Sequence, residues 1–578
     1  MRPTFLAFQT AYRAIATGQI QLDTAGNNIS NVQTEGYSRQ RVDTNSVSNG
    51  GYIQKFKPMD VTAGGGVEAK RVSRVRDQFL DARYRMQNSE NEKYTAILSG
   101  LNDLENVLDQ TLYDGLLAEI ANFKEALNPM LENPPSNDMA MVVRKAADTV
   151  VSLLNTYAQS IEDVRNQQIY DLKTNINTDF NSTVQNIAAL NKQINEEIAH
   201  GNTPNELLDE RDLLFDKLSG FANVRIDITS KWLSSSLKVE DVEIKILDEK
   251  TNTEIDLIKN DIYNTLSVAE NNDGTVSIKV NSAFGNKNLA YGNDVTPFLT
   301  SGSLGGALDV INGTGTEFIS LSQDLAEPNR FRGTLYYKGM LDTFAANFAR
   351  ALNEINAYNP NEEMPRSFKV SSQLLADGST ANPDYDSADP YYDETLDSTK
   401  PAFDPTKWTD TVNAYKKEDR PLFSTIDPLL PEITAANIRI SPEWLADPMQ
   451  LTVTQPGDPS EGENIGRMII AIEQGFTFYV AGDSNKGKIF DGTLEEYFTG
   501  VNATLGLDVA LYKNYSETSG YIMTTLFTAR ESVSGVSLDE EGVALMTYQK
   551  SYNAAVRFFT VLDEMVDRII NEMGLAGR

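Results

Sequence analysis

The chain has 578 residues, a formal net charge of −32 at pH 7 and no cysteine. The missing cysteines exclude disulfide bonds, thiolate metal sites and cysteine nucleophiles. The acidic balance argues against binding to nucleic acid or to anionic membranes, because both depend on clustered lysine and arginine. No apolar run is long enough to predict a transmembrane helix. The length is sufficient for three or more domains.

The first predicted element is an amphipathic helix over residues 5–29. Its apolar side chains recur at steps of three and four, or at sums of these, and form one stripe: Phe5, Phe8, Tyr12, Ile15, Leu22 and Ile29. This opening stretch lacks the uninterrupted apolar segment and the cleavage site of a signal peptide. We therefore expect a protein that stays in the cytoplasm or is exported by a route that reads another signal.

Long helices are also predicted inside the chain. One pattern runs from Ser136 to His200 and ends at Gly201, where His200 is expected to cap the helix rather than to bind metal or to catalyse. Residues 203–220 read as a helix with Thr203 as N-cap and Glu206 closing a capping box. Residues 336–357 also read as a helix, and Thr493 and Glu496 open a further helical region.

Strand patterns occupy the middle of the chain. The segments 224–228, 242–247 and 275–280 alternate apolar and polar residues, and "NNDG" before the last of them predicts a hairpin turn. "ANIRIS" and "QLTVT" further on are also strand-like. The sequence thus predicts a multidomain α+β fold, in which helices from both chain ends pack together and β-rich regions are inserted between them.

The last predicted helix carries a strict heptad pattern, which is typical of a coiled coil. Its seam residues alternate steps of three and four: Leu545, Tyr548, Tyr552, Ala555, Phe559, Leu562, Val566, Ile569 and Met573. Ser537 as N-cap and Glu540 form a capping box at its start. Apolar stripes are usually core, but little chain remains at either end to cover these two seams. We therefore expect both to pack between subunits.

Two stretches suggest chemistry, and both have simpler explanations. Gly482–Lys488 nearly matches a phosphate-binding loop, but Ile489 replaces the hydroxyl residue that would hold Mg²⁺, so a polar loop is favoured. Asp384, Asp386 and Asp389 lie in an acidic stretch without the spacing or the glycine of an EF-hand. We therefore expect no specific Ca²⁺ or Zn²⁺ site, because the ligand spacing is wrong and thiols are absent.

The polar run "NNISNVQTEGYSRQ" follows the first helix. Asn27, Asn28 and Asn31 are expected to cap helix carbonyls and to shape a turn, and Gly36 to supply a left-handed backbone before Tyr37. The run resembles the N-terminal signature of flagellar axial proteins. "GGGVEAKRVSRVRDQFLDARYR", "NELLDERDLLFDKLSG", "SGSLGGALDV", "ITAANIRIS" and above all "SGVSLDEEGVALMTYQKSYNAAVRFFTVLDEMVD" resemble further blocks of the flagellar hook-associated protein 1 family.

This resemblance implies a structural role in the bacterial flagellum, without catalysis or cofactor. It implies type III export in unfolded form to the extracellular flagellum, and a ring of identical subunits that joins hook to filament. The implied partners are hook protein on one side, a second junction protein on the filament side and an export chaperone at the C-terminal helix. Nucleic acid and membrane are not expected partners. Alternatives are another axial protein, such as hook protein or flagellin, and a phosphate-binding enzyme at Gly482–Lys488.

The resemblance also suggests a division into domains. Residues 1–45 and 537–578 would form the terminal coiled coil, and 46–220, 300–360 and 490–536 the helical body. Residues 221–299 would be an inserted β-rich region. Residues 361–489 would be a β-rich outer region, with an acidic insertion at about 360–425.

Overall fold

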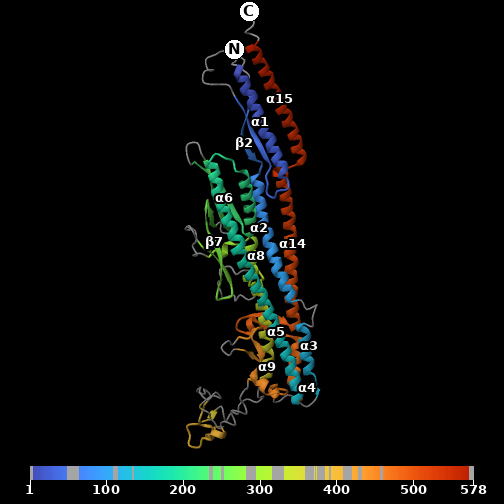
Figure 1. Cartoon of the computed structure of the whole chain (residues 1–578). Helices are drawn as coiled ribbons and strands as arrows, with labels where there is room; N and C mark the ends of the chain where they lie inside the picture. Colours follow the sequence, from blue (N-terminus) through green and yellow to red (C-terminus); the bar gives the residue numbers. More distant parts are fainter. Residues whose placement is uncertain are drawn as a thin grey trace, which may run out of the picture. The chain divides into compact units, whose positions relative to one another are not determined.

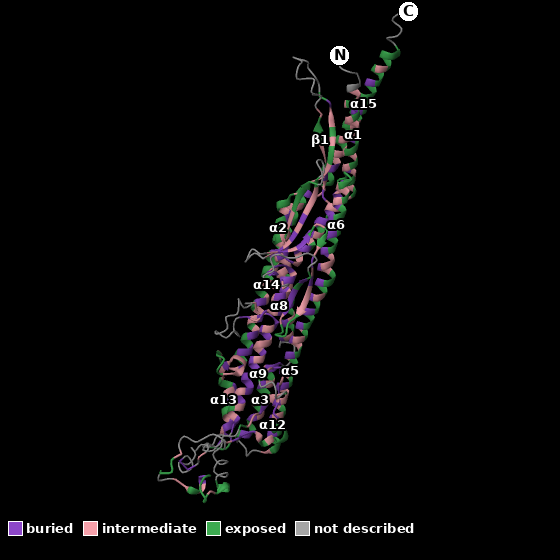
Figure 2. Cartoon of the chain, turned by 90° about the vertical axis from the view of Figure 1, so that its left-hand side faces the viewer, coloured by how far each residue is buried: buried purple, intermediate pink, exposed green. Residues whose placement is uncertain are grey.

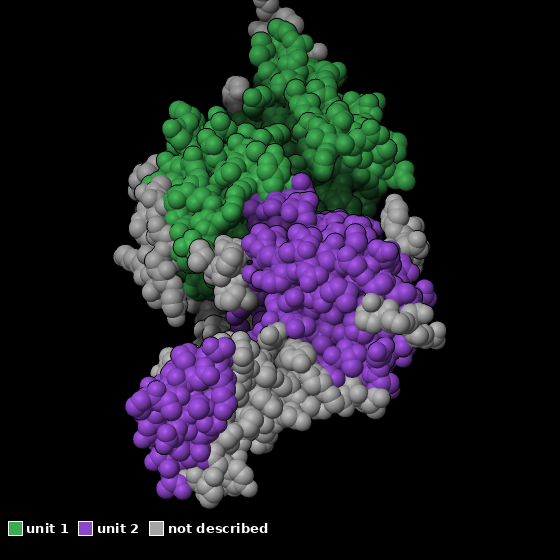
Figure 3. Space-filling model, turned by 90° about the horizontal axis from the view of Figure 1, so that it is seen from below, with its two compact units in different colours: residues 1–98, 170–308, 512–578 green, residues 99–169, 309–511 purple. Residues whose placement is uncertain are grey.

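The fold is described from a computed structural model that divides into two compact units. Unit 1 comprises residues 1–98, 170–308 and 512–578, and unit 2 comprises 99–169 and 309–511 (Figure 3). The structure describes residues 4–47, 64–108, 115–132, 136–232, 238–248, 253–281, 294–315, 331–357, 370–371, 373, 385–388, 392–407, 419–426, 432–455 and 460–571.

The two chain ends form a helix pair in unit 1. Helix α1 (Thr4–Ser30) and helix α15 (Leu538–Asn571) run antiparallel side by side (Figure 1). The antiparallel hairpin of β1 (Gln40–Ser46) and β2 (Val67–Arg74) packs against α1. There the Ala69 backbone N–H donates to Thr17 Oγ1 at 3.2 Å, which ties the hairpin to the helix.

The remainder of unit 1 is a layer of helices against small antiparallel sheets. Its helices are the first part of α2 (Gln78–Leu108), the last turn of α5 (Asn137–Thr174), a π-helical segment (Asn175–Phe180), α6 (Asn181–Ala199), α7 (Asn205–Phe221) and parts of α8 (Gly302–Asn312) and α14 (Leu494–Ser534). The strands β3 (Val224–Trp232), β4 (Lys238–Asp248), β5 (Thr253–Lys259) and β6 (Ile262–Tyr263) form one sheet in that order, and β7 (Thr265–Glu270) pairs with β8 (Val276–Asn281). A short 3-10 helix, Thr296–Phe298, follows.

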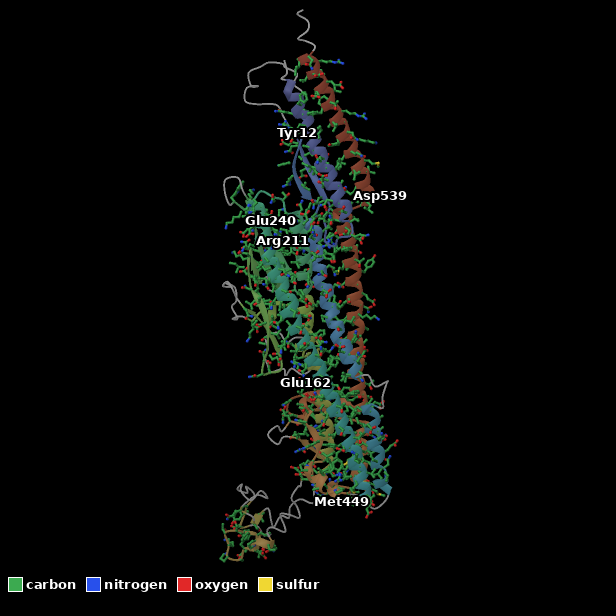
Figure 4. The ribbon with its side chains drawn as sticks, in the orientation of Figure 1. Tyr12, Glu162, Arg211, Glu240, Met449 and Asp539 are labelled. Atoms are coloured by element: carbon green, nitrogen blue, oxygen red, sulfur yellow. The ribbon has the colours of Figure 1, made fainter. Side chains whose placement is uncertain are left out.

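Asparagines on α6 join this helix to the strands. Asn195 donates to the Glu240 carbonyl at 3.0 Å and accepts from the Glu240 N–H at 2.9 Å. Asn181 makes the same two bonds to the Leu266 backbone. Arg211 of α7, whose side chain is buried, pairs with Glu240 of β4 at 2.8 Å (Figure 4). Each amide thereby satisfies strand backbone groups that burial would otherwise leave unpaired.

Unit 2 packs helices around an aromatic core. Its elements are α3 (Leu116–Leu127), α4 (Pro129–Glu132), most of α5, α9 (Thr334–Asn356), α12 (Pro442–Ala446), α13 (Glu463–Gln474) and the start of α14, with the strand pairs β9 (Phe423–Thr425) and β10 (Ile438–Ile440), and β11 (Phe476–Tyr479) and β12 (Lys488–Gly492). Short 3-10 helices are Glu394–Leu396, Pro448–Gln450 and Val480–Gly482. The largest core side chains include Phe123, Phe348, Phe423, Trp444 and Phe478.

The predicted α+β class is confirmed, with long helices at both ends and small sheets in the middle. The capping box at Thr493 is also confirmed, since Glu496 Oε2 accepts from the Thr493 N–H and Thr493 Oγ1 accepts from the Glu496 N–H. Two local predictions are wrong. "QLTVT" forms no strand. Thr203 does not cap α7, because the helix begins at Asn205 and the Glu206 carboxylate accepts from the Gln40 side chain instead.

Candidate assembly surface

The seam residues of the two terminal helices differ in how far they are buried between the helices. Leu562 and Ala555 are buried, and the Phe8 and Phe559 rings pack edge to face with centroids 5.2 Å apart. Ile15, Leu22, Leu545, Tyr548, Tyr552 and Val566 are half-buried. Tyr12 and Ile569 are 67% and 47% exposed, and the side chain of Phe5 lies outside the described residues. Tyr12 on α1 (Figure 4) is therefore mostly exposed to solvent.

Gly18 lies where α1 and α15 meet. A Cβ atom at Gly18 would lie 3.4 Å from the Tyr552 Cβ, at the short end of ordinary van der Waals contact. The α1 backbone therefore lies close to the Tyr552 side chain, and a side chain much larger than alanine at Gly18 would have to displace it.

The turn after α1 is held by its asparagines. Asn28 is buried, and its Oδ1 accepts from the Gln40 N–H at 3.0 Å and from the Tyr37 hydroxyl at 2.9 Å, while its Nδ2 donates to the Gln40 carbonyl at 2.9 Å. Asn31 Nδ2 donates to the carbonyl and the side chain of Asn27. Asn28 therefore pairs with the start of β1 as a neighbouring strand would.

The backbone of the turn reverses at Gly36, where φ is +77°. That left-handed conformation costs a residue with a side chain more than it costs glycine. Burial, and next the carboxylates of Asp209, Glu206 and Glu541, raise the pKa of Tyr37 to about 12. The Tyr37 hydroxyl thus stays protonated and can donate to Asn28.

The N-terminal turn is joined to the start of α15 through Arg39. Its backbone N–H donates to the Ser534 carbonyl at 2.8 Å, and its guanidinium pairs with Glu541 at 2.7 Å and with Glu540 at 2.9 Å. Ser537 Oγ accepts from the Glu540 N–H at 3.4 Å. We call the two segments 31–39 and 534–541 the elbow. In the elbow, the segment that follows α1 lies beside the segment that leads into α15.

Next to the elbow lies a closed network of six ion pairs that we call the ion ring. Arginine and aspartate alternate around it: Arg76, Asp81, Arg530, Asp216, Arg85 and Asp212, with successive N–O distances of 2.8, 3.9, 2.5, 2.8, 3.5 and 3.2 Å. These side chains come from α2, α7, α14 and the segment before α2, and each is largely buried.

The ion ring is also bonded to the elbow. Arg74 bridges Asp212 and Asp209 at 2.8 Å each, and Asp209 accepts from the Ser38 N–H at 3.0 Å. Burial alone would raise the pKa of Asp212, but Arg76, Arg74 and Arg85 together lower it below its usual value. The carboxylate is therefore charged in the folded protein, as the ring requires.

Sequence reasoning did not find the ion ring, although one signal of it was present. Asp209, Asp212 and Asp216 follow one another at steps of three and four on a helix, which places three carboxylates on one face. A helix face with three carboxylates, on a helix that is otherwise rich in leucine, indicates that arginine or lysine side chains from other elements pack over it. Which arginines do so depends on contacts over more than 100 residues of chain.

The candidate phosphate loop lies in unit 2 between β11 and β12. Lys488 is the first residue of β12, not of a helix, and its ammonium pairs with Asp491 in the same hairpin. Backbone N–H groups of a helix N-terminus, which hold phosphate in such loops, are therefore missing after Lys488. The structure favours the polar-loop interpretation.

Metal sites and membrane-spanning helices can be assessed only for the described part of the chain. Within it, no three His, Cys, Asp or Glu side chains are grouped so that they could hold a metal ion. Asp384 and Asp389 lie outside the described residues. None of the described helices combines the length and hydropathy needed to span a membrane.

Comparison with known proteins finds three family models that match parts of the chain. Residues 101–360 match the family model described as the flagellar hook-associated protein FlgK helical domain. Residues 8–37 match flagella basal body rod protein, and residues 530–572 match the C-terminal model of the flagellar basal body rod FlgEFG proteins. The two shorter matches coincide with much of α1 and α15.

Full-length relatives share one name. Flagellar hook-associated protein 1 of Bacillus subtilis (strain 168) is 27% identical, with 100% of both chains covered. Those of Salmonella typhimurium and Escherichia coli (strain K12) are 22% identical, over 97% of this chain and 98% of theirs. A solved structure of the flagellar hook junction protein FlgK from Burkholderia pseudomallei aligns with a TM-score of 0.36 at 19% identity, over 48% of this chain and 44% of that one. Along nearly its whole length, the chain is thus similar to flagellar hook-associated protein 1.

Proposed function

We propose that this chain is a structural protein of the bacterial flagellum, which forms a ring of identical subunits that joins hook to filament. The observation that carries the proposal is the terminal helix pair. α1 and α15 contact each other and still expose many apolar side chains, and Figure 2 colours most of α15 as exposed or intermediate. An exposed apolar surface of this extent indicates contact with other subunits.

The elbow supports the same function. A polymerising helix pair must hold one orientation relative to the body, because small angular errors repeat in every subunit of a ring. Asn28, Arg39 and the ion ring fix the entry and the exit of the pair through hydrogen bonds and buried ion pairs. We assign positioning to Asn27, Asn28, Asn31, Gly36 and Tyr37, and assembly contacts to the seam residues.

The proposed inner layer consists of residues 1–45 and 537–578, as the sequence suggests. The names of the chain's relatives place those proteins at the hook. Hook-associated proteins are exported parts of the external flagellum and assemble with other axial proteins. For this chain we propose hook protein as the neighbour on one side and a second junction protein on the other. We further propose that an export chaperone covers the C-terminal helix before assembly. The family is one of structural proteins and not a class of enzymes.

The test is a strain of the source bacterium that lacks the chain. We expect it to keep its hooks, lose its filaments and release flagellin into the medium, and an intact copy to restore all three. Antibody labelling of purified flagella should place the chain between hook and filament. Filaments on the deletion strain, or label along the whole filament or the whole hook, would contradict the proposal and favour flagellin or hook protein.

A further inference from the structure

Helix α15 has two outer flanks of opposite charge beside the seam that faces α1. One, the basic flank, consists of the apolar Phe558, Val561 and Met565 bordered by Lys550, Arg557 and Arg568. The other, the acidic flank, consists of Val556 and Ile570 with Asp563 and Asp567. In the heptad frame of the seam, Phe558 and Met565 occupy g positions, and Val556, Asp563 and Ile570 occupy e positions.

Neither flank is covered by the rest of unit 1. Phe558, Val561 and Met565 are between 46% and 55% exposed, and Ile570 is 68% exposed. Arg557, Arg568, Asp563 and Asp567 are exposed too, and the described residues contain no ion pair that involves them. Glu564 is also exposed, and it shares the f position on the back of the helix with Lys550 and Arg557, next to the basic flank. The basic flank thus offers apolar surface bordered by three cations and one acid. The acidic flank offers apolar surface with two carboxylates, of which Asp567 accepts from Asn571 at 2.6 Å.

We propose that the basic flank of one copy packs against the acidic flank of the next copy, so that α15 helices join side by side through unlike surfaces. This inference rests on the proposed function and names the partner surface within it. Charge complementarity identifies the occupant, because the helix itself presents the matching acids next to matching apolar residues. When subunits join through unlike surfaces, each end of a row of subunits keeps one free flank. Further subunits can therefore add until the row closes into a ring or continues as a helix.

Symmetry sets the direction of the helices, and the apolar residues of the flanks set their register. Copies related by rotation about an assembly axis along the helices have parallel α15 helices. Because the a/d seam of α15 faces α1, the register between neighbouring copies is set by matching the apolar residues of the two flanks, and we propose the register that places Met565 beside Ile570. Met565 would then contact Ile570 of the next copy, and Phe558 and Arg557 would contact its Asp563. Contacts between like flanks would instead place Arg557 near Arg557, or Asp563 near Asp563.

Cysteine cross-linking tests this arrangement cleanly, because the natural chain has no thiol. The variant Met565→Cys with Ile570→Cys carries one thiol on each flank. These two positions are about 7.5 Å apart along one helix axis, too far for a disulfide within the chain. In oxidised flagella we expect this variant to give a ladder of dimers, trimers and longer species on a non-reducing gel.

The single variants are the matched controls. Met565→Cys alone and Ile570→Cys alone should give no dimer, and co-expression of the two should give dimers and nothing longer. Dimers from either single variant would show that like flanks meet, and would overturn the inference. So would the absence of a ladder in flagella that contain the double variant. If antibody finds no chain at the junction while filaments are normal, the proposed function itself fails.

A charge exchange provides a second measurement. Arg557→Glu places a carboxylate opposite Asp563 of the neighbour, and we expect loss of the ladder from the double-cysteine chain. Adding Asp563→Arg to the same chain reverses both charges and should restore the ladder. Lys513→Glu, the same change of charge at an exposed site on α14, should leave the ladder intact. Equal losses from Arg557→Glu and Lys513→Glu, or no rescue by Asp563→Arg, would contradict the pairing.

Discussion

Replacing Arg76 by methionine tests whether the ion ring stabilises unit 1. The guanidinium of Arg76 pairs with Asp81 at 2.8 Å and with Asp212 at 3.2 Å, and it donates to Ser38 Oγ at 3.4 Å. Methionine keeps much of the length and the apolar contact but removes the charge. Asp212 keeps Arg74 and Arg85, whereas Asp81 is left with Arg530 at 3.9 Å.

The expected cost follows from burial. The side chains of Arg76 and Asp81 are 13% and 8% exposed, so the variant leaves a buried carboxylate nearly unpaired. Such a loss costs about 3–5 kcal/mol. At about 2 °C per kcal/mol for a unit of this size, the melting temperature of unit 1 should fall by about 6–10 °C.

Arg71→Met is the matched control. Arg71 pairs with Asp43 at 2.9 Å, but its side chain is 61% exposed, and exposed pairs contribute about 0–1 kcal/mol. Differential scanning calorimetry of the two variants and the natural chain would measure the shifts. A shift for Arg76→Met no larger than that for Arg71→Met would refute the stabilising role of the ring. Adding Asp81→Asn to Arg76→Met should recover part of the loss, because it removes the unpaired charge.

Three further outcomes are expected. The pKa of Asp212 is lower in the folded chain than its usual value of 3.8. The charged carboxylate therefore stabilises the fold fully above pH 3.8, and this stabilisation is lost as the pH falls through the folded pKa. Melting temperatures measured across acidic buffers should decrease once the pH is lower than about 4. Limited proteolysis of the monomer should trim residues 1–45 and 537–578 and leave a stable middle, since the terminal helices leave much of their surface exposed in a single subunit. Resistant ends would contradict this. Lys488→Ala should leave swimming speed normal, because its ammonium contacts only its own hairpin in the described structure.

Local patterns predicted both terminal helices and several interior ones, but not α2, α3, α8 or α13. The heptad pattern and the Ser537 cap located α15, whose first helical residue is Leu538. The pattern over 336–357 located α9, which spans Thr334–Asn356. These signals depend on neighbouring residues along the chain, so sequence alone carries them. The break of the long interior helix into α5, a π-helical segment at Asn175–Phe180 and α6 was not predicted, because helical periodicity barely changes there.

The contacts that fix the elbow could not be read from the sequence. Arg530 is 314 residues from Asp216, and Arg39 is 502 residues from Glu541. A charged residue in a sequence predicts an exposed side chain unless its partner is known, and no periodicity identifies a partner so far away. Asn28 was expected to help shape the turn, but its pairing with the Gln40 backbone depends on where β1 begins.

The structure divides the side chains of α15 into seam residues that hold the helix pair together and flank residues that we propose to act in assembly. Leu562 is only 9% exposed in a single subunit, so an aspartate there would bury a charge against α1 and separate the two helices before any subunit is added. Phe558 is 46% exposed on the outer flank, so an aspartate there would remain in water until a neighbour docks. Both changes should abolish junction assembly, but only Leu562→Asp should also reduce the helix content of the monomer. Comparing the two by circular dichroism therefore separates folding of the terminal pair from its polymerisation.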